Sequence, residues 1–576
     1  METVSQGQTL FLARLAIGLA QGLVLYLLYS AGEAKTWPAT QGTIFVPLLL
    51  VSLAAPVGLI LSLGAMSCRK ALTWVGIASA LVALLGFFDS WMGASQVFDI
   101  EIPSVQLVLF GAGGLFIAHA LVTGGVTDRR FMASYPTHFD VAWKLAVQLA
   151  LSILFVGAFW LLLWLGAGLF GLVKLDFFEK LLQHAWFSIP VLSVAAAGAL
   201  HLTDIRPVLV QGARTLLLTL LSWLLPLITV IVGGFVATLP FTGLGALWSI
   251  GHATALLLAA AAVLIVLINA AYQDGMPERM PPKILRLAGT VAAILTVPLT
   301  LIAAYALFLR VHQYGWSVDR VTVAAIILVA LAYAGGYAHA ALMRGPWLAR
   351  IESWNFHVSL LALALMIALF TPLASPARIA VADQMARLKE GRISPANFDF
   401  RYLRWHGGRY GLTALNDLKR STNATVRDGA SAALLEKNPD APGPSSSWPQ
   451  NVKVYPAGQK LPRDFVETPW DRVSCRIANV GACQAVLADF DGDGQQDILI
   501  FPVKGGAGQI FVRKPDGAWR QKGRIKIPLH CTGLLAALQE GRFKISPEAH
   551  PLSRIEAAGV SLHIAPVPDS EPSCPK

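Results

Sequence analysis

Charged residues are scarce in this chain. They make up 14% of its 576 residues, whereas 55% are hydrophobic, and the mean hydropathy is +0.58. Soluble globular proteins carry about 25% charged residues, so the deficit indicates that much of the chain lies in lipid. Up to Pro372 the charges stand in short clusters between long apolar runs, and beyond it they reach the density of a soluble protein. This shift predicts the main domain boundary.

Signatures of the common enzyme classes are also missing. The sequence has no G-x-S-x-G nucleophile elbow, no Walker phosphate loop and no H-E-x-x-H zinc helix. The net charge of +11 comes largely from basic residues that flank the apolar runs. We therefore expect the lipid bilayer, rather than nucleic acid, to be the acidic partner.

Eleven apolar runs are long enough to cross a membrane as helices. A hydrocarbon core of about 30 Å requires about 20 helical residues, and backbone exposed to lipid has to satisfy its hydrogen bonds within the helix. The fifth run is long and the sixth is short, so either could be broken or interfacial. The predicted fold class is an all-α polytopic membrane bundle of about eleven transmembrane helices, followed by a small C-terminal periplasmic α+β, mainly β, domain. The runs are Leu10–Ser30, Ile44–Leu63, Ala71–Trp91, Pro103–Val122, Trp143–Val173, Phe187–Leu202, Ala213–Leu239, Ile250–Tyr272, Ile284–Leu309, Val321–Met343 and Phe356–Leu373.

The basic residues of the short connections predict the orientation, because Lys and Arg are enriched in cytoplasmic loops. With a cytoplasmic N-terminus, the inner loops hold twelve basic residues and the outer loops hold five. We expect a bacterial inner-membrane protein whose C-terminus, after an odd number of helices, is periplasmic. A signal peptide in place of the first helix would leave this orientation unchanged. The twelve are Arg69, Lys70, Arg129, Arg130, Lys144, Arg206, Arg214, Arg279, Lys283, Arg286, Arg344 and Arg350, and the five are Lys35, Lys174, Lys180, Arg310 and Arg320.

The five cysteines are unevenly distributed: Cys68 lies at an inner helix end, and the other four follow the last apolar run. Clustering in a soluble domain is typical of disulfides in an oxidising compartment, which agrees with a periplasmic location. Four cysteines allow three pairings, of which we favour Cys475–Cys483 with Cys531–Cys574. A zinc site is the alternative, although no C-x-x-C pair is present.

Composition divides the chain into four predicted segments. Residues 1–373 form the membrane domain, 374–437 a helical juxtamembrane segment, 438–450 a linker rich in Pro and Ser, and 451–576 the disulfide-bearing domain. Within the second segment, Ala377–Glu390 has apolar residues at helical spacing opposite a charged face. We expect this helix either to lie on the membrane surface or to pack against the C-terminal domain. Asn423–Lys437 is predicted to form another short helix.

Several short stretches between Phe187 and Leu418 resemble a known family. They are His201–Pro207, Ser222–Pro226, Leu239–Leu244, Ile268–Gly275, Leu309–Trp316, Phe398–Arg404 and Gly407–Gly411. Together they resemble the bacterial multi-pass membrane proteins catalogued as domain of unknown function four-one-five-three. The resemblance implies a location and a topology, and it implies no catalytic residues.

A short acidic motif, DFDGDGQQD at residues 489–497, predicts a calcium site. Aspartates at its first, third, fifth and ninth positions, with Gly at the sixth, can surround Ca²⁺ with oxygens. An EF-hand needs a Glu at the twelfth position, where this chain has Ile500. The flanking residues predict strands, so the motif resembles one calcium hairpin of integrin-type FG-GAP repeats. The alternative is an acidic turn without an ion, but four close carboxylates repel unless a cation neutralises them. The predicted ligands of this structural Ca²⁺ are Asp489, Asp491, Asp493, Asp497 and the carbonyl of Gln495.

Polar side chains within the apolar runs are further candidates, because each is costly in lipid and such residues often mark a pathway. Asp89, His119, Gln148, His201, His252, Asn269 and His339 lie in different runs, without the spacing of metal ligands. A second set lies near the inner ends of the sixth and eighth runs and predicts a polar network: Asp204, Arg206, Asn269, Gln273 and Asp274. Hydrogen bonding between helices is the alternative for both sets.

Three function classes remain open. The helix number and the intramembrane polar groups favour a transport or channel-like role, with a calcium-stabilised periplasmic domain. A membrane-anchored scaffold or sensor that binds an envelope protein partner is the alternative. A membrane-embedded enzyme comes third, because the sequence contains no recognisable nucleophile or metal constellation.

Overall fold

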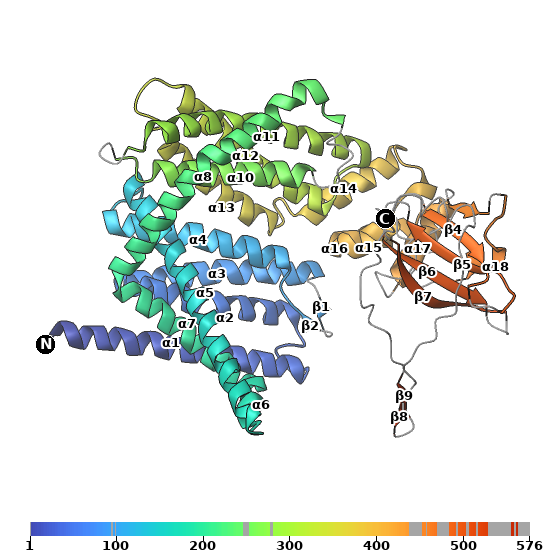
Figure 1. Ribbon diagram of the computed structural model, residues 1–576, viewed down its shortest axis with the longest axis horizontal. Helices are drawn as coiled ribbons and strands as arrows, with labels where there is room; N and C mark the ends of the chain where they lie inside the picture. The colour runs from blue at the N-terminus through green and yellow to red at the C-terminus, as the bar shows by residue number, and fades with distance from the viewer. Residues whose placement is uncertain are drawn as a thin grey trace, which may run out of the picture. The chain divides into compact units, whose positions relative to one another are not determined.

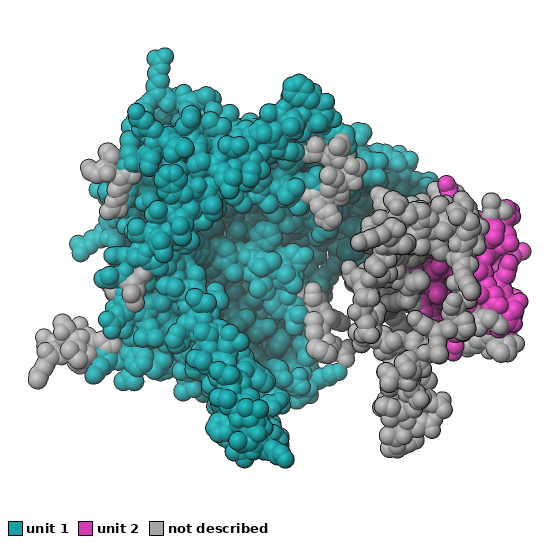
Figure 2. Space-filling model, in the orientation of Figure 1, with its two compact units in different colours: residues 1–427 teal, residues 428–576 magenta. Residues whose placement is uncertain are grey.

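The structure is a computed structural model of the chain. It describes residues 2–93, 96–97, 100–245, 253–276, 280–436, 452–456, 458–468, 483–490, 493–502, 506–513, 517–527, 555–557 and 560–562. The chain forms two compact units, Met1–Arg427 and Asp428–Lys576 (Figure 2). Each unit is described by itself below.

Among its described residues, the first unit contains eleven helices that are long and apolar enough to cross a membrane, which confirms the predicted fold class (Figure 1). The fifth apolar run forms one unbroken helix of 38 residues, and the sixth forms a helix of 21 residues. The eleven helices are α1 (Glu2–Glu33), α2 (Gly42–Ser62), α3 (Cys68–Gly93), α4 (Val105–Asp128), α5 (Tyr135–Leu172), α7 (Ala185–Ile205), α8 (Pro207–Thr242), α10 (Ala253–Tyr272), α11 (Lys283–Tyr314), α12 (Val318–Leu342) and α13 (Ile351–Leu369). The short helix α6 (Phe177–Gln183) follows α5, and the strands β1 (Gln96–Val97) and β2 (Ile100–Glu101) pair between α3 and α4.

The helices of this unit form two packed groups (Figure 1). In the first group, α1 packs on α7 and α2 packs on α3. In the second, α11 packs on α8, α10 and α12, and α13 packs on α12. Helices α4 and α5 contact members of both groups, with α5 touching α7 on one side and α8 on the other. Any rearrangement of one group relative to the other therefore involves α5.

Helices α1 and α7 approach each other closely through glycines. A Cβ atom at Gly18 would lie 2.6 Å from Cβ of Ala197, and one at Gly22 would lie 2.4 Å from Cα of Pro190. These two glycines form a G-x-x-x-G pair on one face of α1, a pattern that allows close backbone contact between membrane helices. The second group packs in a similar way, through buried alanines such as Ala261, Ala292 and Ala303.

The juxtamembrane segment belongs to the first unit and packs against helix ends. It comprises α14 (Pro376–Lys389), η2 (Pro395–Asn397), α15 (Phe400–His406) and α16 (Gly408–Leu418), and α17 (Ala424–Leu435) follows. Asp383 of α14 accepts a hydrogen bond from the backbone N–H of Trp316 at 2.8 Å, and the Tyr402 hydroxyl accepts one from Val318 N–H at 2.8 Å. The predicted amphipathic helix therefore lies against the connection between α11 and α12.

The second unit is built on a mixed sheet of five strands, as the sequence predicted for a small, mainly β domain. The strand order is β3 (Lys453–Tyr455), β4 (Cys483–Ala488), β5 (Asp497–Pro502), β6 (Gly506–Arg513) and β7 (Trp519–Ile527), with β3 parallel to β4 and the other pairs antiparallel. Phe465 of α18 (Arg463–Glu467) is fully buried against Phe511 and Trp519 on one face of the sheet. A separate short pair is formed by β8 (Ile555–Ala557) and β9 (Val560–Leu562).

Candidate functional site: two buried polar clusters

Two polar clusters lie at the same end of the helical bundle. Hydrogen bonds join the first half of α1 and the start of α13 to the C-terminal parts of α7, α10 and α12. Because consecutive helices alternate in direction, α3, α5, α8 and α11 also begin at this end. We call it the Asp204 end. The juxtamembrane segment contacts the other end, where α11 finishes and α12 begins.

The first cluster is charged and consists of Arg14, Lys144, His201 and Asp204. Arg14 on α1 is 1% exposed, and its Nη2 donates to Oδ2 of Asp204 on α7 at 2.7 Å. Its Nη1 lies 3.2 Å from Nδ1 of His201. Nζ of Lys144 on α5 donates to the other carboxylate oxygen at 3.2 Å. One carboxylate thus joins cations from two other helices.

Neighbouring residues enclose this charged cluster. A Cβ atom at Gly64, in the turn after α2, would lie 2.3 Å from Oδ2 of Asp204 and 2.7 Å from Nη2 of Arg14. Any side chain at position 64 would therefore displace the paired groups of Arg14 and Asp204. One turn further along α5, Nε2 of Gln148 donates to the carbonyl of Leu200 at 3.1 Å and fixes α5 against α7. A buried charge is tolerated only when it is paired in this way.

The second cluster is uncharged and consists of Tyr135, Asn269, Tyr337 and Asn355, from α5, α10, α12 and α13. Nδ2 of Asn269 donates to the Tyr337 hydroxyl at 2.6 Å, which donates to Oδ1 of Asn355 at 2.7 Å. Nδ2 of Asn355 donates back to Oδ1 of Asn269 at 2.7 Å and lies 3.3 Å from the Tyr135 hydroxyl. The three hydrogen bonds form a closed ring, which satisfies polar groups that would be costly in a low-dielectric interior.

A carboxylate lies at the edge of this Asn–Tyr cluster. The Tyr272 hydroxyl donates to Oε1 of Glu352 at 2.6 Å, and the Tyr272 ring lies 5.9 Å from the ring of Tyr135. Trp347 packs on Tyr272 from the other side at 5.9 Å, and its Nε1 donates to the Arg286 carbonyl at 3.0 Å. The carboxyl group is thus held by an aromatic hydroxyl.

Helix α5 connects the two clusters. It contributes Tyr135 to the Asn–Tyr cluster and, nine residues later, Lys144 to the charged cluster, a separation of about 13 Å along the helix. The rings of Phe139 and Trp143 fill the interval, each about 6 Å from the preceding ring. The clusters are therefore neighbours along one rigid element.

The five residues of the predicted polar network do not form one cluster: two belong to different clusters and three lie outside both. Asp204 belongs to the charged cluster and Asn269 to the Asn–Tyr cluster. Asp274 is 6% exposed and accepts a hydrogen bond from the backbone N–H of Met276 at 3.2 Å. Gln273 follows α10 with a φ of +55°, and Arg206 is exposed at the junction of α7 and α8. All five lie at the Asp204 end, where the sequence placed them.

The intramembrane histidines lie apart from one another, each with its own partner. Nδ1 of His119 accepts a hydrogen bond from the Trp74 indole at 3.1 Å, and Nδ1 of His339 lies 3.3 Å from the Trp354 indole nitrogen. His201 contacts Arg14, and His252 lies outside the described residues. Hydrogen bonding between neighbouring helices accounts for the first two.

Residues around the predicted calcium loop form the expected hairpin of β4 and β5, in which Ala488 pairs with Asp497. Oδ2 of Asp489 accepts from Gly494 N–H and Oδ2 of Asp497 accepts from Phe490 N–H, both at 2.9 Å, and Asp497 is fully buried. Oδ1 of Asp493 accepts from the N–H of Gln495 at 2.8 Å. Asp491 lies outside the described residues, and within them no three His, Cys, Asp or Glu side chains are grouped to hold a metal ion.

Of the cysteines, Cys68 is free and exposed, as predicted. Cys483 is fully buried at the first position of β4. Cys475, Cys531 and Cys574 lie outside the described residues.

Sequence reasoning did not single out Arg14, Tyr135, Tyr337 or Asn355, nor Glu352 at the edge of the Asn–Tyr cluster. Arg14 lies inside the first predicted run, Leu10–Ser30, where a charge is itself a sign of an intramembrane site. Glu352 and Asn355 were placed before the eleventh run, whereas α13 already begins at Ile351. Both residues lie within four positions of the start of the predicted run, and their spacing of three places them on one face of a helix. This was the available sign that the helix begins earlier.

Eleven candidate spans and a small sheet domain define a multi-pass membrane protein. The chain belongs to the family described as domain of unknown function (DUF4153), whose sequence pattern matches residues 16–418. That range includes the whole Asn–Tyr cluster and all of the charged cluster except Arg14. No curated protein and no solved structure matches the chain.

Proposed function

We propose that this protein has a transport role, in which Asp204 exchanges its cationic partners for a proton. The supporting observation is the fully buried Arg14, ion-paired at 2.7 Å to a carboxylate that also binds Lys144. Ionisable side chains inside a membrane bundle are costly and typically mark proton, ion or substrate pathways. A proton on Asp204 would neutralise the group that holds α1, α5 and α7 together.

The helix arrangement gives this exchange a mechanical consequence. Helix α5 carries Lys144 and also Tyr135 of the Asn–Tyr cluster. Release of Lys144 would therefore free α5 to move relative to α7 while the Asn–Tyr cluster still binds it to the second helix group. Such a movement of one group against the other is a common basis of alternating access.

Proton flux into vesicles tests the proposal. The full chain is reconstituted into liposomes containing a pH-sensitive dye, and a potassium diffusion potential is imposed. We expect vesicles with the wild-type protein to acidify faster than protein-free vesicles. Vesicles with the Asp204→Asn variant should acidify at the rate of protein-free vesicles. Asp140→Asn is the matched control, because Asp140 pairs with Arg214 on the surface of the same helix region and is 58% exposed. Wild-type vesicles without flux, or equal flux with Asp204→Asn, would contradict the proposal.

For the location, we infer a bacterial inner membrane, with a cytoplasmic Asp204 end and a periplasmic C-terminal unit. The support is the excess of basic residues at the loops of the Asp204 end and the contact of α14 and α15 with the opposite end. Reporter fusions after Lys576 test this orientation. Activity of a reporter that works only in the cytoplasm would contradict it.

The C-terminal unit, we further propose, is stabilised by one Ca²⁺ and two disulfides. The Asp-rich loop sits between paired strands, which supports the calcium site. For the disulfides, the support is that Cys483 is buried at the start of β4 and that the three other cysteines beyond the last span belong to the same unit. Mass spectrometry of unreduced, alkylated protein should label Cys68 alone, and labelling of all five cysteines would contradict the proposed pairing.

A further inference from the structure

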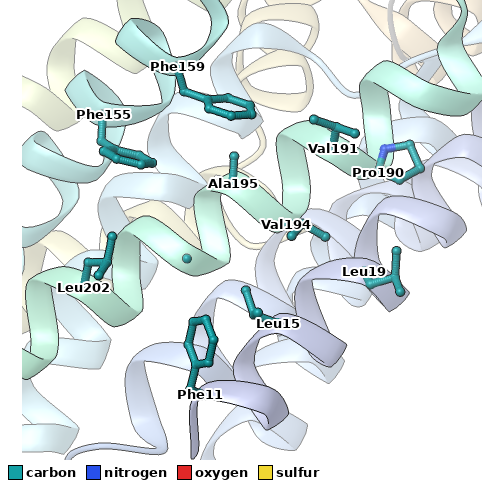
Figure 3. Close-up of a pocket in the computed structure, with 11 residues that line it drawn as sticks. Phe11, Leu15, Leu19, Phe155, Phe159, Pro190, Val191, Val194, Ala195 and Leu202 are labelled. Carbon is teal, nitrogen blue, oxygen red and sulfur yellow. The ribbon is translucent and has the colours of Figure 1, made fainter. Parts of the chain in front are cut away.

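An apolar groove runs along the first helix group, between α1, α5 and α7 (Figure 3). Its volume is about 430 Å³, within the range of about 300–1,000 Å³ of ligand pockets. Phe11, Leu19, Phe155 and Leu202 line it and are 37%, 46%, 44% and 47% exposed. Because all three helices are long and apolar enough to cross the membrane, the groove opens towards lipid.

One end of this groove adjoins the charged cluster. The Phe11 ring lies 4.8 Å from the ring of His201, and Leu202 precedes Asp204 by two residues. On α5, Lys144 shares one helical face with Phe155, because eleven residues make about three turns. Two cations at this end remain accessible: the Lys144 side chain is 47% exposed, and Arg206 is exposed where α7 ends.

The length of the groove corresponds to one leaflet. Its lining residues on α7 extend from Leu202 back to Pro190, twelve residues or about 18 Å of helix, a little more than half of a hydrocarbon core of about 30 Å. An acyl chain whose head group lies beside Lys144 and Arg206 would therefore extend along Phe11, Val194 and Phe155 to the middle of the bilayer (Figure 3).

We infer that the groove binds one acyl chain of an anionic phospholipid, with the phosphate beside Lys144 and Arg206. Arg14, Lys144 and Arg206 provide three positive charges at this end against the carboxylate of Asp204, and the carboxylate of Asp140, one turn before Lys144, is paired with Arg214. The excess favours an anionic over a zwitterionic head group. This inference is independent of the proposed transport role, because lipid binding can be measured in a protein that moves no substrate.

Native mass spectrometry of the delipidated full chain in detergent tests the site. The protein is titrated with phosphatidylglycerol and with phosphatidylcholine of identical acyl chains. We expect tighter binding of phosphatidylglycerol, weakened about fivefold by either Lys144→Gln or Arg206→Gln, with little change for phosphatidylcholine. Gly198→Leu should weaken both lipids, because a Cβ at Gly198 meets Leu15 only at 3.9 Å and a larger side chain would fill the groove.

Lys174→Gln is the matched control, since Lys174 is an exposed lysine just beyond the far end of α5. It should leave the preference for phosphatidylglycerol unchanged. Arg206→Gln keeps the test informative if Lys144→Gln disturbs the Asp204 ion pair. Equal binding of the two lipids by wild type, or a preference that survives both charge variants, would overturn the inference. Displacement of phosphatidylglycerol by glycerol phosphate at equal concentration would show that the groove is not used, and would overturn it too.

Discussion

Gly336 on α12 lies directly against the indole ring of Trp354 on α13. A Cβ atom at Gly336 would be 2.4 Å from Cδ2 of Trp354, whereas one at the adjacent Gly335 would meet no atom within 4 Å. Nε1 of the same indole lies 3.3 Å from Nδ1 of His339. One of two neighbouring glycines is therefore a packing contact between helices, and the other faces open space.

We expect Gly336→Ala to destabilise the protein and Gly335→Ala to leave its stability unchanged or slightly raised. Overpacking a close contact costs about 1–3 kcal/mol, whereas replacing a helical Gly by Ala gains up to about 1 kcal/mol. Melting temperatures of the detergent-solubilised chain measure the difference. Equal melting temperatures for the two variants would show that α12 and α13 do not pack as described.

Much of this fold could be predicted from the sequence because lipid constrains it strongly. A span needs about 20 apolar residues in a helix, and each of the eleven predicted runs overlaps one helix of the required length. Likewise, the apolar residues on both sides of the acidic loop predicted the strands of the β4–β5 hairpin.

The clusters were predicted less completely, for two physical reasons. Averaged hydropathy excludes polar residues from a span, so Glu352 and Asn355 fell outside the eleventh run although they face other helices. Partners far apart in the chain leave no local pattern: Arg14 and Asp204 are 190 positions apart. Burial of Arg14 thus depends on packing of α1 against α7, which local periodicity does not encode.

The ion pair itself can be measured by a double-mutant cycle of Arg14→Leu and Asp204→Leu. Breaking one side of a buried pair costs about 3–5 kcal/mol. We expect Asp204→Leu to be the more damaging change, because it leaves Arg14 buried, whereas Arg14→Leu leaves Asp204 paired with Lys144. The double variant should be more stable than the sum of the single effects implies.

The pair Arg214–Asp140, whose side chains are 18% and 58% exposed, provides the control for this cycle. Surface ion pairs contribute about 0–1 kcal/mol, so the same cycle there should be nearly additive. Unfolding of the solubilised chain in a denaturing detergent supplies the free energies. Additive effects for Arg14 and Asp204 would mean that they do not interact.

Removal of one hydroxyl tests the Asn–Tyr cluster. Tyr337→Phe deletes the group that accepts from Asn269 and donates to Asn355, and we expect a loss of about 1–2 kcal/mol of stability. Tyr333→Phe is the control, one turn earlier on α12, with its ring packed against Tyr337 at 5.6 Å and its hydroxyl outside the ring of hydrogen bonds. Indistinguishable melting temperatures for the two variants would contradict the cluster.

The C-terminal unit should lose stability in acid through Asp464. Desolvation is the largest single effect and would raise the pKa of this carboxyl, but the hydrogen bond and charge of Arg513, together with the other hydrogen bonds to Asp464, outweigh it and hold the pKa below its ordinary value. The pKa of Asp464 is lower in the folded than in the unfolded state. Its ionised form therefore contributes fully to the free energy of unfolding above the unfolded pKa of about 3.9, and this contribution is lost as pH falls through the folded pKa. Between pH 5 and pH 3, we expect the melting temperature of this unit to fall less for Asp464→Asn than for wild type.

Calcium should raise the melting temperature of the C-terminal unit, because an ion at the loop would hold the β4–β5 hairpin against repulsion among its carboxylates. Outward-facing modules bind Ca²⁺ with a Kd of about 10⁻⁴–10⁻³ M, and at about 100 times Kd the stabilisation is about 2.7 kcal/mol. In the full chain, Asp491→Ala should abolish the difference between calcium and chelator. Asp464→Asn is the control: it removes the ion pair with Arg513, whose two residues lie outside the motif at 489–497, and should keep the calcium response. If the wild-type unit melts at one temperature in calcium and in chelator, residues 489–497 form only an acidic turn, in which the buried Asp497 accepts the Phe490 N–H without an ion.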